Sequence, residues 1–321
     1  MRCAVTGGAG YIGSVTTALL ADAGHDVVVI DNLSTGHRDA VSVPLVEADL
    51  RDTEAMVKAL KGVDAVIHFA AKSIVPESVA HPDLYWDNNV GGSTSLLAAM
   101  REAGVHRLVF SSTAATYGDP ARVPIREQDA TEPTNPYGQS KLATDQAISQ
   151  QAAEGWLAAA SLRYFNVAGA HGQLSERHDP ETHLIPVVLN GLGVADSAPV
   201  RVFGTDWDTP DGTCVRDYVH VVDLARAHLL ALDVLVTGEH QIVNLGSGSG
   251  FSVLEVIGAV ERVTGLPVPW EAAPRRPGDP QTLVASIERA AELLGWEPRL
   301  SLDEMIADAW RVLRSRSQRG L

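Results

Sequence analysis

The stretch Thr6-Gly7-Gly8-Ala9-Gly10-Tyr11-Ile12-Gly13 follows the first apolar run of the chain and opens its first helical pattern. Glycines at these positions allow a tight turn, let the backbone approach a pyrophosphate, and let a helix pack closely on a strand. The start of the following helix would present N–H groups to negative charge. The stretch therefore predicts a dinucleotide-binding turn built on Gly7, Gly10 and Gly13.

Further along the chain, short β-branched runs alternate with segments of helical periodicity. The runs are apolar throughout, which is typical of parallel strands that are covered by helices on both faces. We therefore expect an α/β fold with a doubly wound, parallel-sheet Rossmann domain. The expected strands are Arg2–Thr6, Asp26–Ile30, Pro44–Glu47, Ala65–Phe69, Arg107–Ser111, Ala159–Arg163 and Ile242–Leu245, and the expected helices include Ile12–Ala23, Thr53–Leu60, Asn89–Ala103 and Gly138–Ala153.

The pattern changes after about residue 165, where stretches rich in Gly, Pro and Asp separate short elements. We interpret residues 1–165 as the dinucleotide-binding domain, with a strand near residues 241–246 that returns to its sheet. Residues 166–321 are then mainly a smaller C-terminal α/β lobe that binds the substrate.

The bulk properties exclude several classes of partner. The chain has 321 residues and a formal net charge of -15, which argues against a nucleic-acid partner, since that would require a clustered basic surface. Cys3 and Cys214 are the only cysteines, so no disulfide framework is expected. No apolar stretch is long enough to span a bilayer and no signal peptide precedes the first strand, so we expect no membrane partner and a cytoplasmic location.

The second predicted strand ends in Asp31-Asn32, about 20 residues past the glycine loop. A carboxylate at that strand end can accept hydrogen bonds from an adenosine ribose and would repel a 2′-phosphate. The cofactor is therefore expected to be NAD rather than NADP. Asp49 follows the next strand at the same edge of the sheet and is a candidate adenine contact.

Tyr137 and Lys141 lie four residues apart, after a Pro-rich turn, and so share one face of a predicted helix. A phenol titrates near ~10, so use near neutrality needs selective stabilisation of its anion. Lys141 together with a positive nicotinamide ring could supply it. Thr113 follows the fifth predicted strand, where a hydroxyl would point into the same crevice and share a proton with the phenol.

These motifs together resemble the extended short-chain dehydrogenase/reductases. The resemblance is carried by the glycine loop, Asp31-Asn32, Asp49-Leu50, His68-Phe69-Ala70-Ala71, Asp87-Asn88-Asn89-Val90, Ser111-Ser112-Thr113, Tyr117-Gly118 and Tyr137-x-x-x-Lys141. Within that family, the motifs Leu162–Ala170, Pro210–Val221 and Ala273–Asp279 resemble the UDP-glucose 4-epimerase branch. The resemblance spans almost the whole chain and implies reversible inversion at C4 of a UDP-hexose, through a transient 4-keto sugar, with tightly bound NAD.

The resemblance also implies roles for individual residues. Tyr137 would be the catalytic base, Lys141 its activator and the anchor of the nicotinamide ribose, and Thr113 the hydroxyl partner. The residues implied for NAD, beyond the three glycines, are Tyr11, Ile12, Asp31, Asn32, Ser34, Asp49, Leu50, Phe69, Ala70, Asn88, Lys141 and Phe165. Those implied for the UDP-sugar, beyond Thr113 and Tyr137, are Asn166, His183, Phe203, Arg216, Tyr218, Arg276 and Asp279.

The sequence departs from the family pattern in ways that leave the sugar open. His183 stands where the family usually has an asparagine that meets the diphosphate, and Leu283 stands where the side chain bounds the hexose pocket. A bulky tyrosine at that second position restricts substrates. Leucine therefore leaves open a 4-epimerase of another UDP-sugar, namely a UDP-N-acetylhexosamine, UDP-uronate or UDP-pentose.

Other interpretations are less favoured. A 4,6-dehydratase would need an acid/base pair after the threonine, but Ala114-Ala115 follows Thr113. A non-catalytic NAD-binding regulator conflicts with the intact Tyr137, Lys141 and Thr113. A zinc site among His171, His178 and His183 lacks helical ligand spacing, so no metal is expected. Relatives form homodimers through the helices corresponding to Asn89–Ala103 and Gly138–Ala153, and we expect a homodimer here.

Overall fold

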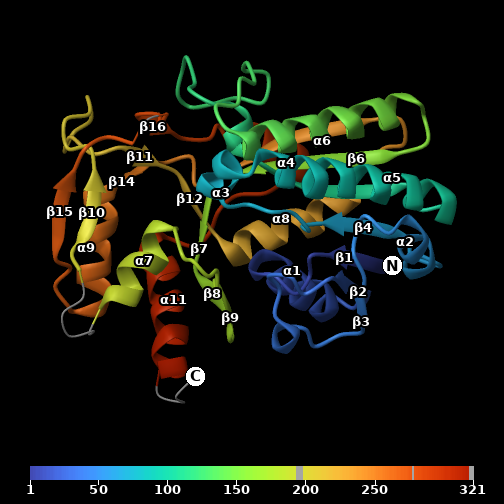
Figure 1. The fold of residues 1–321 in the computed structure, drawn as a ribbon, viewed down its shortest axis with the longest axis horizontal. Helices are drawn as coiled ribbons and strands as arrows, with labels where there is room; N and C mark the ends of the chain where they lie inside the picture. Colours follow the sequence, from blue (N-terminus) through green and yellow to red (C-terminus); the bar gives the residue numbers. More distant parts are fainter. Residues whose placement is uncertain (193–197, 277, 318–321) are drawn as a thin grey trace.

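A seven-stranded parallel sheet forms the centre of the computed structural model, which describes residues 1–192, 198–276 and 278–317 (Figure 1). Its apolar strands pair in parallel with their neighbours, as expected for a sheet buried on both faces. In spatial order the strands are β13 (His240–Leu245), β6 (Ala158–Tyr164), β5 (Arg107–Thr113), β4 (Ala65–His68), β1 (Arg2–Thr6), β2 (Asp26–Asp31) and β3 (Leu45–Glu47).

Helices cover both faces of the sheet. Alternate strand residues point to opposite sides, and because they are apolar on both sides, each face is buried under helices. Cys3 and Val5 pack with Leu224 of one helical layer, whereas Ala4 packs with Leu96 of the other. The first layer contains α1 (Tyr11–Asp22), α8 (Val221–Asp233) and α10 (Glu288–Leu294), and the second contains α2 (Thr53–Ala59), α5 (Gly92–Ala103) and α6 (Pro136–Ala153). Figure 1 shows α5 and α6 on one side and α1 and α8 on the other. The predicted doubly wound α/β fold is confirmed.

The predicted strands of this sheet are all present, and none of their ends is displaced by more than two residues. The largest differences are at β13, which begins earlier than expected, and at β5. Strand β5 continues to Thr113 because Ser112 and Thr113 still pair with β6. Their polar side chains resemble a loop in the sequence, yet both are buried.

The predicted helix Asn89–Ala103 is wrong at its start. An irregular helical segment precedes it, made of α3 (Val75–Ala80), α4 (Pro82–Tyr85) and a π-helical turn at Trp86–Gly91. The wide turn places the buried Asn89 side chain between two neighbours: it accepts from Lys72 N at 2.8 Å and donates to Ser140 Oγ at 3.0 Å. These bonds tie the turn to α6, and π-turns are frequent at functional sites.

The remaining elements form a smaller region beside the carboxyl ends of the strands (Figure 1). Its core packs Ile185, Val256 and Ile306 from three helices. The helices are α7 (Leu184–Gly191), α9 (Val253–Thr264) and α11 (Leu302–Ser317). Its short strands are β7 (Asn166–Ala168), β8 (Ala170–His171), β9 (Leu174–Ser175), β10 (Val200–Phe203), β11 (Val215–Arg216), β12 (Tyr218–His220), β14 (Phe251–Ser252), β15 (Trp270–Ala273) and β16 (Thr282–Leu283). Within the described residues, short 3-10 turns also occur at Arg38–Ala40 and Ala114–Thr116.

The division at residue 165 stays a prediction, although β13 does join the main sheet beside β6. Pro277, within the motif Ala273–Asp279, lies outside the described residues. Within the described ranges, every helix is too short or too polar to cross a membrane.

Candidate active site

One cleft of about 1580 Å³ runs along the carboxyl edge of the sheet, between the sheet and the smaller region. Every residue predicted for the catalytic group, NAD or the UDP-sugar lines it. These residues come from segments as far apart in the sequence as Gly7 and Asp279. Open parallel sheets bind nucleotides at this edge, so the cleft lies where the fold class expects a ligand.

The glycine turn lies at the floor of the cleft. Gly7 has φ +71°, and a Cβ there would lie 2.5 Å from Ala70 N. A Cβ on Gly13 would lie 2.2 Å from Gly7 O, so only glycine permits this approach of helix to strand. Helix α1 begins directly after Gly10 and has no acidic residue in its first turn. The turn therefore offers an uncovered helix start to an anionic group, and its cradle fits a dinucleotide pyrophosphate.

Asp31 ends β2 with its carboxylate buried and ordered by the backbone. One oxygen accepts from Ala9 N at 3.0 Å and the other from Leu33 N at 2.8 Å. Each oxygen keeps a second lone pair, and the side chain lines the cleft. Asp31 is therefore placed to meet a ribose, as its position in the sequence suggests.

The carboxylate of Asp49, which was predicted to contact adenine, is bonded to two neighbouring side chains. Its carboxylate forms a forked pair with Arg51, with Nε at 2.9 Å and Nη2 at 2.8 Å, and also accepts from Asn32 Nδ2 at 3.0 Å. The bonds from Arg51 hold the pKa of Asp49 well below its usual range. Arg51 also pairs with Asp87 at 2.7 Å. This network fixes one wall of the cleft beside the end of β2.

Helix α6 positions the Tyr–Lys pair. Asn135 caps its start by accepting from Gly138 N at 2.9 Å, and Pro136 occupies the first turn. Tyr137 then lies at the cleft near the side chain of Thr113, the last residue of β5. Burial raises the pKa of Tyr137, and its interaction with the Thr113 side chain only partly opposes this rise.

Lys141 lies one turn further along α6 and is 3% exposed. Its ammonium donates to Ser111 O at 2.8 Å and lies 4.7 Å from the centre of the Phe110 ring. Burial lowers the pKa of Lys141 to about 7, against the opposing charge of Asp145. The prediction that Lys141 and a positive nicotinamide ring together acidify the phenol stays a prediction. The protein's own groups raise the pKa of the phenol.

A second phenol, missed in the sequence, stands beside this group. Tyr164 ends β6 and shares a hydrogen bond with the hydroxyl of Ser111 on β5. Both residues line the cleft, and burial raises the pKa of Tyr164 well above its ordinary value. The signal was available only in part: Ser111 ends one predicted strand and Tyr164 directly follows the neighbouring one, so both were expected near the carboxyl edge of the sheet.

The far end of the cleft carries the predicted UDP-binding residues. Arg216 Nη2 lies 3.6 Å from Asp279 Oδ1, and the Arg276 guanidinium lies 3.8 Å from the centre of the Phe203 ring. Guanidinium groups suit phosphate oxygens because their donors form a planar fork. Tyr218 reaches the cleft but is only 6% exposed and belongs mainly to the core of the smaller region.

Residues 176–183 form one rim of the cleft, and beside the two histidines named from the sequence they hold charged groups that the sequence did not single out. His183 Nδ1 lies 2.7 Å from Glu181 Oε1, and His178 Nδ1 lies 2.6 Å from Glu176 Oε1. Arg177 reaches across to Asp39 near the adenosine end, with bonds of 2.9 and 3.0 Å. The three histidines considered for zinc do not assemble; two of them meet Glu176 instead.

Fold and cleft together define a class: a Rossmann-type protein with a dinucleotide turn and a Tyr–Lys–Thr group facing one cavity. The model of the NAD-dependent epimerase/dehydratase family matches residues 3–246. The chain belongs to this family.

Individual relatives are similar over nearly the full chain. A UDP-glucose 4-epimerase of Corynebacterium glutamicum is 53% identical over 313 residues, covering 97% of this chain and 95% of that protein. One from Streptomyces lividans is 55% identical over 311 residues, covering 95% and 94%. Among solved structures, the UDP-glucose 4-epimerase of Stenotrophomonas maltophila, with bound NAD and formylated UDP-arabinopyranose, superposes with a TM-score of 0.96 at 41% identity and covers 99% of each chain.

Proposed function

We propose that this chain is an isomerase, an NAD-dependent UDP-glucose/UDP-galactose 4-epimerase that inverts C4 reversibly through a transient 4-keto sugar. One observation carries the proposal. The catalytic group of Tyr137, Thr113 and Lys141 lies in the same cleft as the glycine turn and the two arginines, Arg216 and Arg276. The full-length similarity to proteins named UDP-glucose 4-epimerase supports it.

The cofactor is proposed to lie along the sheet edge. The turn at Gly7 and Gly13 would hold its pyrophosphate. Neither position has room for a side chain, so the backbone of the turn stays uncovered. Asp31 would accept from the adenosine ribose, and Lys141 would donate to the nicotinamide ribose from its place beside Ser111 O. NAD, when bound, supplies a hydride acceptor and a positive ring that favours the phenolate.

In the proposed chemistry, Tyr137 removes the proton of the sugar 4-hydroxyl and later returns it. The Thr113 hydroxyl lies near the phenol and would share this proton with the substrate. Ala114 and Ala115 follow Thr113 at the cleft wall and carry no ionisable group, so a 4,6-dehydratase lacks its acid/base pair here.

The nucleotide end of the substrate is proposed to lie between Arg216 and Arg276, with the uracil near Phe203. Asn166, His183, Tyr218 and Asp279 complete this end of the cleft. Binding energy from this remote part would hold the keto sugar in the cleft while the sugar turns its opposite face toward the cofactor.

A second candidate is a 4-epimerase of another UDP-sugar. Leu283 lines the cleft and packs near Phe165 and Ala285, where a larger side chain would narrow the sugar pocket. A similar solved structure, 38% identical with a TM-score of 0.85, is described as a UDP-Glc/GlcNAc 4-epimerase of Campylobacter jejuni. A panel of UDP-hexoses, UDP-N-acetylhexosamines, UDP-uronates and UDP-pentoses distinguishes the two.

Pure protein incubated with UDP-galactose, without added cofactor, tests the proposal. We expect UDP-glucose to form, as resolved by chromatography of the nucleotide products. Tyr137→Phe should reduce turnover about 100-fold or more while UDP affinity stays near normal, because the proton transfer is lost and the nucleotide contacts remain. Unchanged turnover in that variant, or no product from the wild type, would refute the assignment.

We also propose a homodimer formed through α5 and α6, a cytoplasmic location and a role in galactose metabolism. The family resemblance supports the dimer, and two buried, unpaired cysteines are consistent with a reducing compartment. Light scattering of the purified protein tests the dimer: a monomeric mass at micromolar concentration would exclude it.

A further inference from the structure

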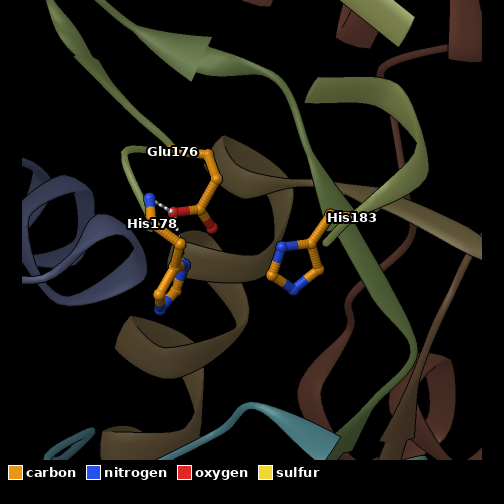
Figure 2. A group of neighbouring side chains, drawn as sticks. All are labelled: Glu176, His178 and His183. Atoms are coloured by element: carbon orange, nitrogen blue, oxygen red, sulfur yellow. Dashed lines mark hydrogen bonds and ion pairs between the residues drawn. The ribbon is translucent and has the colours of Figure 1, made fainter. Parts of the chain in front are cut away.

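Glu176, His178 and His183 form a cluster on the segment between β9 and α7. One potential ligand atom from each lies within 4.8 Å of the others. Figure 2 shows the Glu176 carboxylate between the two imidazole rings. We propose that this cluster is a binding site for a divalent transition-metal ion, with Zn²⁺ as the probe, at the rim of the cleft.

The donor set matches the chemistry of such an ion. Two imidazoles and one carboxylate are a common three-residue ligand set for Zn²⁺, which takes a fourth ligand from solvent or substrate. All three residues line the cleft, so a fourth position would open toward it.

A neighbouring carboxylate orients one of the imidazoles. Glu181 Oε1 lies 2.7 Å from His183 Nδ1 and also accepts from the backbone N–H groups of Thr182 and His183, each at 2.8 Å. A carboxylate can only accept, so the proton at this contact belongs to Nδ1, which leaves Nε2 with a free lone pair. Metal-binding histidines commonly have such a carboxylate behind them.

The second ligand pair is also arranged in advance. Glu176 Oε1 accepts from Arg177 N at 2.7 Å and from His178 N at 3.1 Å, which fixes the carboxylate. His178 Nδ1 is buried 2.6 Å from the same oxygen, yet its orientation gives no hydrogen bond. A metal ion would give this buried nitrogen the partner that it lacks.

The local charge favours a cation over an anion. Glu176 and Glu181 bring two carboxylates to the cluster, and the guanidinium of the intervening Arg177 is turned away toward Asp39. With neutral imidazoles the cluster is therefore negative. A phosphate would meet these carboxylates at close range, whereas a divalent cation would neutralise them.

Equilibrium dialysis of the NAD-loaded protein against Zn²⁺, with the metal measured by atomic absorption, tests the proposal. We expect one ion per chain. His178→Gln and His183→Gln should each weaken binding at least about tenfold, and Glu181→Ala should weaken it about 10- to 100-fold through the orientation of His183. His171→Gln is the matched control, because His171 is also partly buried in the same region but lies outside the cluster. Its affinity should equal that of the wild type.

Thermal unfolding checks that each variant is folded. If a histidine variant does not fold, Zn²⁺-dependent shifts of the imidazole NMR signals of the wild type decide instead. Shifts at His178 and His183 but not at His171 support the site. A dissociation constant weaker than about 1 mM, or equal affinity in the folded His178 and His183 variants, overturns it. Since the readout is metal binding, the result is independent of epimerase activity.

Discussion

Asp145 and Arg163 form a buried ion pair one helical turn beyond Lys141. Arg163 Nη2 and Nε each lie 3.0 Å from Asp145 Oδ2, and both side chains are at most 3% exposed. The same oxygen accepts from Ser112 Oγ at 3.0 Å. The pair thus fastens the helix that carries Tyr137 to the two strands whose ends complete the catalytic group.

Asp145→Asn should destabilise the protein by about 3–5 kcal/mol, because it leaves Arg163 charged and uncompensated in the core. Urea unfolding followed by circular dichroism measures the loss. The control is Glu154→Gln, which breaks the exposed pair with Arg101 at 2.7 Å. That change should cost no more than about 1 kcal/mol. Equal losses in the two variants would mean that Arg163 finds another partner.

Lys141 should make stability depend on pH in the alkaline range. Burial lowers its pKa to about 7 in the folded protein, from 10.5. Between these values the unfolded chain binds more protons than the folded one, so stability rises as pH rises through this window. Lys141→Met removes the titration. Relative to the wild type, the cofactor-free variant should therefore gain stability as pH falls from about 10 to about 7.

Urea unfolding of both proteins at several pH values within that window gives the difference in free energy. Other titrating groups contribute alike to the two proteins and cancel. A difference that does not change with pH would show that the lysine keeps its ordinary pKa when buried.

The sequence predicts the main sheet well because its signals are local. Each parallel strand is a short apolar run followed by a helix, and the glycine turn has a fixed place between the first pair. The residues at the strand ends follow from this topology, which is why Asp31 and Thr113 are found at the cleft.

The smaller region was not predictable in the same detail. Its strands are two to four residues long, and β7 pairs with β12 across about fifty residues of chain. Such pairs leave no periodic signal. The cluster of Glu176, His178 and His183 was missed for the same reason, since a loop conformation brings Glu176 between the histidines. The pairing of Asp49 with Arg51 was also unpredictable, because either side chain could equally have faced solvent alone; the contact of Asp49 with adenine stays a prediction.

Gly13→Ala should abolish tight binding of NAD. A Cβ at this position would lie 2.2 Å from Gly7 O, so α1 or the turn must shift and the pyrophosphate cradle is lost. The effect is measured by gel filtration of the protein, release of the nucleotide that stayed bound, and the absorbance of that nucleotide. Gly258→Ala in α9 is the matched control, because a Cβ there meets nothing within 4 Å. The control should keep its cofactor and gain up to about 1 kcal/mol of stability from helix propensity. Retained NAD in the Gly13 variant would place the pyrophosphate elsewhere.

Leu283→Tyr should narrow the choice of sugar. Leu283 is half-buried at the cleft beside Phe165, and a tyrosine would extend a ring into the space proposed for the hexose. An N-acetyl group needs that space, whereas a hydroxyl does not. We expect kcat/KM for a UDP-N-acetylhexosamine to fall at least about tenfold more than kcat/KM for UDP-galactose, since a steric clash of about 1.4 kcal/mol already gives that ratio. Leu283→Met keeps the side-chain volume and should leave the ratio unchanged. An equal fall for both substrates in the tyrosine variant would mean that residue 283 does not bound the sugar pocket.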